Sequence, residues 1–242
     1  MRKSVVLFSG GLDSTVALYR ALEISDVVAV LCIDYAQQGR THELDAAQKI
    51  WVEIINTRRQ YTYPDFLISK VDMNTRSALF ADFSLDPKQD YPSNHFTDMG
   101  LPRAFVPSRN LTMLSLAASL AFNVGATIIY GGWSGGDIGY PDCNPLFFSL
   151  AEDAINAGLG LYHLPIKISI RAPFINSNKA TIIRTGAGLK VPFELTRSCY
   201  AASLQPCLKC DACLTRIEGF REAGIKDPTV SEEQWELYLD TQ

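Results

Sequence analysis

The stretch "FSGGLDST", residues 8–15, decides how the chain is expected to fold. It follows the apolar run "SVVLFS" (4–9), which indicates a buried strand, and it leads into a helical pattern over 15–24. A strand, a glycine-rich turn and a helix in this order bring free backbone N–H groups and the helix dipole to one point, where an anion binds. The stretch therefore predicts a phosphate-binding loop. Further hydroxyl donors are available from Ser9, Ser14 and Thr15.

The residues of this loop exclude two common nucleotide-binding motifs. A Walker loop would carry a lysine directly before its Ser/Thr, where this chain has Asp13. A dinucleotide fingerprint would read G-x-G-x-x-G, and the two glycines here are adjacent. For a pair of glycines alone, a plain strand-to-helix turn is the alternative interpretation.

Strand-like and helix-like patterns alternate along the rest of the chain. This order predicts an α/β fold, a doubly wound parallel sheet with helices on both faces. Asn110 is expected to cap one helix, which ends at Gly125, and Ser177 to cap another. The strands are expected at 27–34, 66–72, 126–132 and 166–174, and the helices at 42–55, 110–125, 145–158 and 177–188.

The organisation of the chain is that of one large domain with a small appendage. We expect an α/β domain with the phosphate-binding loop over 1–190 and a helical region over 191–242 that contains four clustered cysteines. Residues 73–107 are polar and proline-dotted, so they indicate a functional loop or lid. A net charge of −4 disfavours a broad nucleic-acid surface, and no apolar run approaches the length of a membrane span. The apolar start is too short for a signal peptide, which favours the cytoplasm.

Four of the six cysteines lie within fifteen residues: Cys199, Cys207, Cys210 and Cys213. Their spacing, C-x₇-C-x₂-C-x₂-C, suits four thiolates on one tetrahedral Zn²⁺. A closed set of four leaves no open position, so the zinc is expected to be structural. A group of reduced, packed cysteines is the alternative.

The pattern S-G-G-x-D-S after the first strand resembles the PP-loop of the N-type ATP pyrophosphatases. Members of that superfamily cleave ATP between the α and β phosphates and transfer AMP to a substrate. The resemblance implies that the loop residues Ser9, Gly10, Gly11, Asp13 and Ser14 cradle the pyrophosphate.

The chain as a whole resembles the 7-cyano-7-deazaguanine (preQ0) synthase family, QueC. Besides the PP-loop and the cysteines, the resemblance is carried by "FVPSRN" (105–110), "GYPDC" (139–143), "SCY" (198–200), "CLKCDACLTRIEGF" (207–220) and "DPTV" (227–230). It implies a Rossmann-like fold of the adenine nucleotide alpha hydrolase type, and a homodimer. It also implies that ATP with Mg²⁺ adenylates 7-carboxy-7-deazaguanine. Ammonia then forms an amide, and a second activation yields the nitrile that feeds queuosine or archaeosine synthesis.

The same resemblance assigns roles to individual side chains. Arg109 is expected beside the reacting centre, holding phosphate or carboxylate oxygens, and Lys179 at an ATP phosphate. A surface arginine and a solvated lysine are the plainer alternatives. Asp34 and Tyr35 follow the second strand, where open parallel sheets bind ligands, and are expected to border the adenosine. The substrate itself is assigned to Asp137, Tyr140 and Asp142, with a turn-capping role for Asp142 as the alternative.

Three segments depart from the usual family pattern. In "GGWSGGDIGYPDCN" (131–144) the usual glutamate is missing and Asn144 stands in place of an arginine, "DYAQQGRTHELD" (34–45) is longer by one residue, and the cysteine cluster begins C-x₇-C instead of C-x₈-C. These differences motivate a second hypothesis, in which an antiphage enzyme ligates the activated deazaguanine to a protein amine. A third is a PP-loop protein that only binds nucleotide.

Overall fold

The computed structural model describes most of the chain. The described ranges are 1–58, 64–73, 77–80, 100–102, 104–137 and 139–240. Much of the predicted lid at 73–107 lies outside them, so the prediction of a lid is not tested there.

Five strands form one parallel sheet in the described residues, with the order β3-β2-β1-β4-β5. The chain builds outward from β1 in one direction and then returns to add β4 and β5 on the other side. The carboxyl end of β1 is therefore at the switch point, where open α/β sheets bind ligands. The strands are β1 (Lys3–Leu7), β2 (Asp26–Asp34), β3 (Asp65–Lys70), β4 (Ile128–Tyr130) and β5 (Ser169–Arg171).

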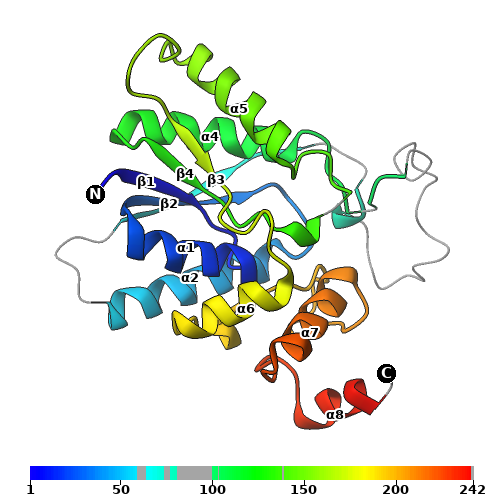
Figure 1. The fold of residues 1–242 in the computed structure, drawn as a ribbon. Coiled ribbons are helices and arrows are strands. Elements are labelled where there is room, and N and C mark those ends of the chain that lie inside the picture. The colour runs from blue at the N-terminus through cyan, green and yellow to red at the C-terminus, as the bar shows by residue number, and fades with distance from the viewer. Residues whose placement is uncertain (59–63, 74–76, 81–99, 103, 138, 241–242) are drawn as a thin grey trace.

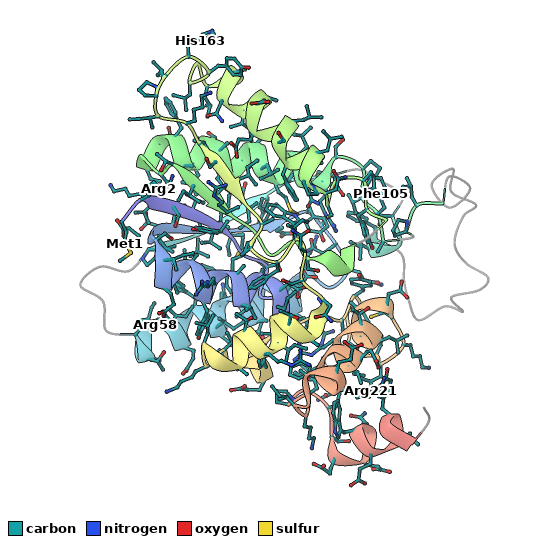
Figure 2. All side chains as sticks on the ribbon, in the orientation of Figure 1. Met1, Arg2, Arg58, Phe105, His163 and Arg221 are labelled. Carbon is teal, nitrogen blue, oxygen red and sulfur yellow. The ribbon has the colours of Figure 1, made fainter. Side chains whose placement is uncertain are left out.

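Helices cover both faces of this sheet, and side chains fill the two layers between (Figures 1 and 2). One layer holds Val16, Ile50 and Ile182, and the other holds Leu114 and Ile155. The predicted doubly wound α/β fold is confirmed. One face carries α1 (Leu12–Ile24), α2 (Arg40–Thr57) and α6 (Lys179–Gly188), and the other carries α4 (Arg109–Val124) and α5 (Pro145–Gly158).

The C-terminal helices follow α6 and lie at the lower right in Figure 1. They are α7 (Asp211–Ala223) and α8 (Glu232–Asp240). Helix α7 packs closely on α6, since a Cβ added at Gly219 would lie 2.3 Å from Cγ of Lys179. Phe220 is fully buried in the core layer between the sheet and α1, α2 and α6. There its ring packs against Phe193, with ring centroids 5.2 Å apart. The C-terminal region therefore shares its core with the sheet, and the division at residue 190 stays a prediction.

A buried ion pair joins α7 to the segment after it. Arg216 and Asp227 are 4% and 0% exposed, and two hydrogen bonds of 2.6 and 3.0 Å connect them. The guanidinium also donates to the Thr196 hydroxyl and to the Phe193 carbonyl. These two parallel hydrogen bonds compensate both charges for the loss of their contact with water. Asp227, the first residue of "DPTV", thus anchors the C-terminal region.

Two predicted helix caps are wrong. Ser108 is the residue before α4, and Asn110 lies inside the helix, where its amide donates to the Asp142 carbonyl at 3.0 Å. Helix α6 is capped by Asn178, whose side chain accepts from the Thr181 N–H, and not by Ser177. At α4 the Ser108 side chain makes no capping bond, and Asn110 has a tertiary partner instead. At α6 the neighbouring Asn178 supplies the capping oxygen. Gly125 does end α4, in a left-handed conformation with φ of 68°.

The last strand is shorter than the expected 166–174 because α5 takes over part of its backbone pairing. Asn156 bonds the N–H and the carbonyl of Ile168, at 2.9 and 2.8 Å, and Glu152 accepts from the Ile170 N–H. The described residues also form three short 3₁₀ turns, at Ala78–Phe80, Gly135–Asp137 and Phe193–Leu195. Among the helices of the described ranges, none has the length and apolar character to cross a membrane.

Candidate active site

The loop after β1 has the backbone of an anion site. Gly10 adopts φ of 74°, and a Cβ there would lie 2.6 Å from the Ala47 nitrogen and 2.7 Å from the Glu43 carbonyl, so only glycine fits. Gly11 precedes α1 without any side-chain cap. The first N–H groups of α1 therefore point outward without the partner that a capping side chain would supply.

Hydroxyl groups hold this loop in shape. The Ser9 and Ser14 hydroxyls lie 3.0 Å apart, and Ser9 accepts from the Gly11 N–H at 3.2 Å. The Thr15 hydroxyl donates to the Gly11 carbonyl at 2.7 Å, and this side chain is fully buried. Ser9 and Ser14 thus face the site, while Thr15 supports the loop from inside the helix.

Asp13 and Lys179 form an ion pair across the front of the loop. Oδ2 of Asp13 is 2.5 Å from Nζ of Lys179, and the two side chains are 25% and 18% exposed. Oδ1 of Asp13 is buried without a hydrogen-bond partner. A buried carboxylate oxygen without a hydrogen-bond partner lowers the stability of the fold. This oxygen is therefore available to accept a hydrogen bond from a ligand or to bind a cation.

A cavity of about 530 Å³ opens above the carboxyl ends of the strands and collects most of the predicted residues. Its wall has a phosphate-loop end and an aromatic end. Among the predicted residues, the wall includes Ser9, Gly11, Asp13, Ser14, Tyr35, Arg109, Tyr140 and Lys179.

The aromatic end of the cavity surrounds Arg109. The guanidinium carbon lies 5.9 Å from the centroid of the Tyr35 ring, and Tyr140 and Tyr200 line the wall nearby. Burial raises the pKa of Tyr35 to about 12, against the opposing effect of Arg109, so the phenol stays protonated. Burial likewise raises the pKa of Tyr200. A flat apolar wall with one fixed cation suits an aromatic acid.

Gly10, Thr15, Asp34 and Asp142 do not line the cavity. Asp34 accepts from the Ala36 N–H at 3.0 Å and so shapes the turn after β2. Asp142 is 7% exposed and accepts from the Asn110 N–H at the start of α4. Asp142 thus supports the start of α4, and its role in binding the substrate stays a prediction. The side chain of Asp137 lies outside the described residues.

Several polar residues of the cavity wall were not predicted, and two of them carry a charge close to the phosphate loop, Glu43 and Arg197. Glu43 lies in the first turn of α2 and accepts from the Gln37 amide at 2.7 Å. Burial raises its pKa, although the bond from Gln37 and the charge of Arg109 oppose this. In the sequence Glu43 belongs to an ordinary amphipathic pattern, and only the packing of α2 on Gly10 brings it to the site.

Arg197 organises the segment before the cysteines. Its backbone N–H donates to the Gly10 carbonyl at 2.9 Å. Its guanidinium donates to the carbonyls of Ala201, Ser203 and Leu204 at 2.7 to 2.9 Å. We call residues 197–204 the strap, because they connect the phosphate loop to the cysteine cluster.

The four predicted cysteines come together. Their sulfur atoms all lie within 4.8 Å of one another, and no other group of metal-binding side chains was found among the described residues. Zn–S bonds of about 2.3 Å place tetrahedral sulfurs roughly 3.8 Å apart, so the donor set fits zinc. Backbone N–H groups donate to two of the sulfurs, from Cys207 to Cys199 and from Cys210 to Cys207. Cys210 is the residue before α7, and Cys213 lies in its first turn.

Comparison with known proteins finds one family along almost the whole chain. The family model described as "Queuosine biosynthesis protein QueC" matches residues 3–224. The 7-cyano-7-deazaguanine synthase of Myxococcus xanthus is 40% identical over 238 residues, which is 95% of this chain and 97% of that protein. The 7-cyano-7-deazaguanine synthase of Archaeoglobus fulgidus is 34% identical over 234 residues, covering 96% and 92%.

Solved structures resemble the chain only distantly. The U34-tRNA thiolase NcsA from Methanococcus maripaludis superimposes with a TM-score of 0.44 at 13% identity, covering all of this chain and 72% of that one. That likeness is too weak to bear on function.

Proposed function

The chain belongs to the QueC family, and we propose on that basis that it converts 7-carboxy-7-deazaguanine to 7-cyano-7-deazaguanine. ATP adenylates the carboxylate, ammonia displaces AMP to form the amide, and a second activation removes water to leave the nitrile. The observation that carries the proposal is the uncapped S-G-G-x-D-S loop, which shares one cavity with a fixed arginine and an aromatic wall.

The phosphate-loop end of the cavity would hold the pyrophosphate half of ATP. The N–H groups at the start of α1 and the Ser9 and Ser14 hydroxyls supply donors. Lys179 adds a positive charge beside the loop, held there by Asp13. Mg²⁺ would accompany ATP, and the unpartnered Oδ1 of Asp13 is suited to a cation.

The aromatic end would take the deazaguanine acid. Tyr140 and Tyr200 offer flat surfaces to the ring system, and Arg109 offers paired donors to the carboxylate. In this arrangement Tyr35 keeps the guanidinium in place from below. The role of Asp137 in binding the substrate, and the adenosine contact of Asp34, stay predictions.

The four cysteines would hold one structural Zn²⁺, which supplies cohesion to the C-terminal region and takes no part in the chemistry. The homodimer implied by the family resemblance also stays a prediction. A ligase that acylates a protein amine finds no support in the matched family or in the names of the relatives.

The test of the proposal is product analysis. The purified protein is incubated with ATP, Mg²⁺, 7-carboxy-7-deazaguanine and ammonium, and both small molecules and intact protein mass are followed. We expect the nitrile, with no change in protein mass. A protein adduct heavier by one deazaguanine acyl group, without nitrile, would overturn the proposal in favour of the protein-amine ligase.

Asp13→Asn is predicted to abolish the activation step. The substitution keeps the shape of the side chain but removes the charge that holds Lys179 and that would hold Mg²⁺ at the phosphates. Exchange of labelled pyrophosphate into ATP, measured with the carboxylic acid present, should fall by about a hundredfold or more. An unchanged exchange rate in this variant would remove Asp13 from the machinery.

A further inference from the structure

We propose that Glu43 is the proton acceptor for the nitrogen nucleophile, a role that rests on the proposed function. Amines attack an acyl-adenylate only as the neutral form, whereas ammonia in water at neutral pH is mostly ammonium. A site that uses ammonia therefore benefits from an anionic group that attracts ammonium and takes its proton.

Glu43 is held in place for such a role. Its carboxylate accepts from Nε2 of Gln37 at 2.7 Å. Gln37 is only 4% exposed, and its own Oε1 accepts from the Tyr35 N–H at 3.2 Å. The carboxylate is thus fixed to the turn after β2, and the backbone of Glu43 packs against Gly10 of the phosphate loop. Glu43 lines the same cavity as the phosphate loop and Arg109, and the charge of Arg109 acts on its carboxylate. We therefore infer that Glu43 lies near the activated carboxyl carbon.

The other carboxylates of the cavity wall are engaged or exposed. Asp13 is ion-paired with Lys179, and Asp211 is exposed at the start of α7. Among the ion pairs found in the described residues, none includes Glu43. Glu43 therefore keeps a charge that is not committed to a cation of the protein.

Charged and titratable groups face Glu43 from several elements. Arg109 of α4 and Arg197 of the strap favour its ionised form. Asp34, at the end of β2, disfavours it, and the nearby Tyr35 and Cys32 have their own pKa values raised to about 12 by burial. Burial of Glu43 raises the pKa of its carboxyl, which makes the carboxylate a stronger base than a solvated one.

In the proposed step Glu43 takes a proton before the carbon–nitrogen bond forms. One proton passes from bound ammonium to the Glu43 carboxylate, which leaves ammonia. The nitrogen lone pair forms a bond to the acyl carbon, and the bond from that carbon to the AMP oxygen breaks, with AMP taking the electron pair. The new amide nitrogen releases a second proton to the departing phosphate.

The experiment compares two nucleophiles in Glu43→Gln. Hydroxylamine is largely uncharged at neutral pH and needs no proton acceptor to attack, so it traps the adenylate as a hydroxamate. Ammonium does need one. We expect hydroxamate formation and pyrophosphate exchange to stay within about threefold of wild type, while amide and nitrile formation falls by about a hundredfold. Raising the pH, which supplies free ammonia, should recover part of the loss.

Asp45→Asn is the matched control, because it removes one carboxylate from the same helix at an exposed position, where it pairs with Lys49. It should leave both reactions unchanged. If Glu43→Gln lowers hydroxamate and nitrile formation equally, Glu43 binds substrate or supports the fold, and the proposal is wrong. It is also wrong if neither reaction falls. Failure of the wild-type protein to form any hydroxamate would instead refute the proposed function.

Discussion

At Glu43 the requirements of chemistry and of stability oppose each other. Burial is the largest cause of its raised pKa, which means that the folded protein holds the ionised carboxylate less well than the unfolded chain does. Below the unfolded pKa, about 4.3, both states are protonated and no penalty exists. As the pH rises above that value, the folded state is increasingly destabilised by this group.

Glu43→Gln should therefore be more thermally stable than wild type at neutral pH. The gain should shrink as the pH falls toward 4 and disappear below it, because the wild-type carboxyl is then protonated in both states. Thermal unfolding of both proteins across pH 4 to 8 measures this difference. A variant that is less stable at every pH would mean that the negative charge of Glu43 stabilises the fold.

Single residues also show which local patterns mislead. Asn110 and Ser177 were expected to cap helices because their side chains suit that position, yet Ser108 and Asn178 precede the helices. Asn110 instead bonds to Asp142 and Cys143, residues more than thirty positions away. A helix-capping side chain contributes about 1 kcal/mol to stability. Two buried tertiary hydrogen bonds, each of similar strength, together contribute more.

At the scale of elements, the strap of residues 197–204 is the connection between the two sites. Besides the bonds of Arg197, the His42 ring nitrogen lies 2.7 Å from the Ala202 carbonyl, so α2 is held as well. A Cβ at Gly39 would lie 3.2 Å from the Tyr200 carbonyl, which shows how closely the turn before α2 fits the strap. The strap thus contacts both the phosphate loop and α2 and holds them in place relative to each other.

Arg197→Gln is predicted to weaken ATP binding while leaving zinc in place. The variant loses guanidinium bonds to three strap carbonyls, so the strap should loosen against Gly10. We expect the KM for ATP to rise by about tenfold, or about 1.4 kcal/mol, with a smaller change in kcat. Zinc content measured by atomic absorption should remain one per chain.

Arg184→Gln serves as the control, since Arg184 is exposed on α6 and bonds only the Glu222 carbonyl among the contacts described. Its KM for ATP should match wild type. If Arg197→Gln loses zinc, Arg197 acts through the metal site, and the positioning of the phosphate loop is not its role.

At the scale of the whole molecule, the C-terminal region and the sheet share one hydrophobic core, so we expect them to unfold together. Phe220 packs in the core layer between the sheet and α1, α2 and α6. Helix α7 lies against α6 next to Lys179 of the cavity. Because α7 begins at the cysteine cluster, a metal held there would stabilise the region that contacts the active site.

Zinc removal should therefore lower both stability and activity. Cys207→Ser, or exhaustive chelation of the wild-type protein, is expected to lower Tm by at least about 5 °C, and added zinc should restore Tm only in the chelated wild type. Differential scanning calorimetry and metal analysis measure both effects. Cys143→Ala, outside the cluster, should still bind one zinc, and loss of zinc from this control would contradict a four-cysteine site.

The sequence by itself determined the parallel α/β fold, the glycine-rich loop after β1 and the cluster of four cysteines. These features depend on local order and spacing: S-G-G-x-D-S directly after an apolar strand, and four thiols within fifteen residues. Features of this kind can be predicted from the sequence because the residues that act together are close along the chain.

Only the tertiary structure decided which side chains share the cavity. It brought Glu43 to the cavity wall from α2, and Arg197 and Tyr200 from the strap. It also placed Asp142 at the start of α4. It also paired Lys179 with Asp13, 166 positions apart. The physical reason is that helix packing sets these contacts: Gly10 admits α2 to the loop, and Gly219 admits α7 to α6, at distances that no local pattern records.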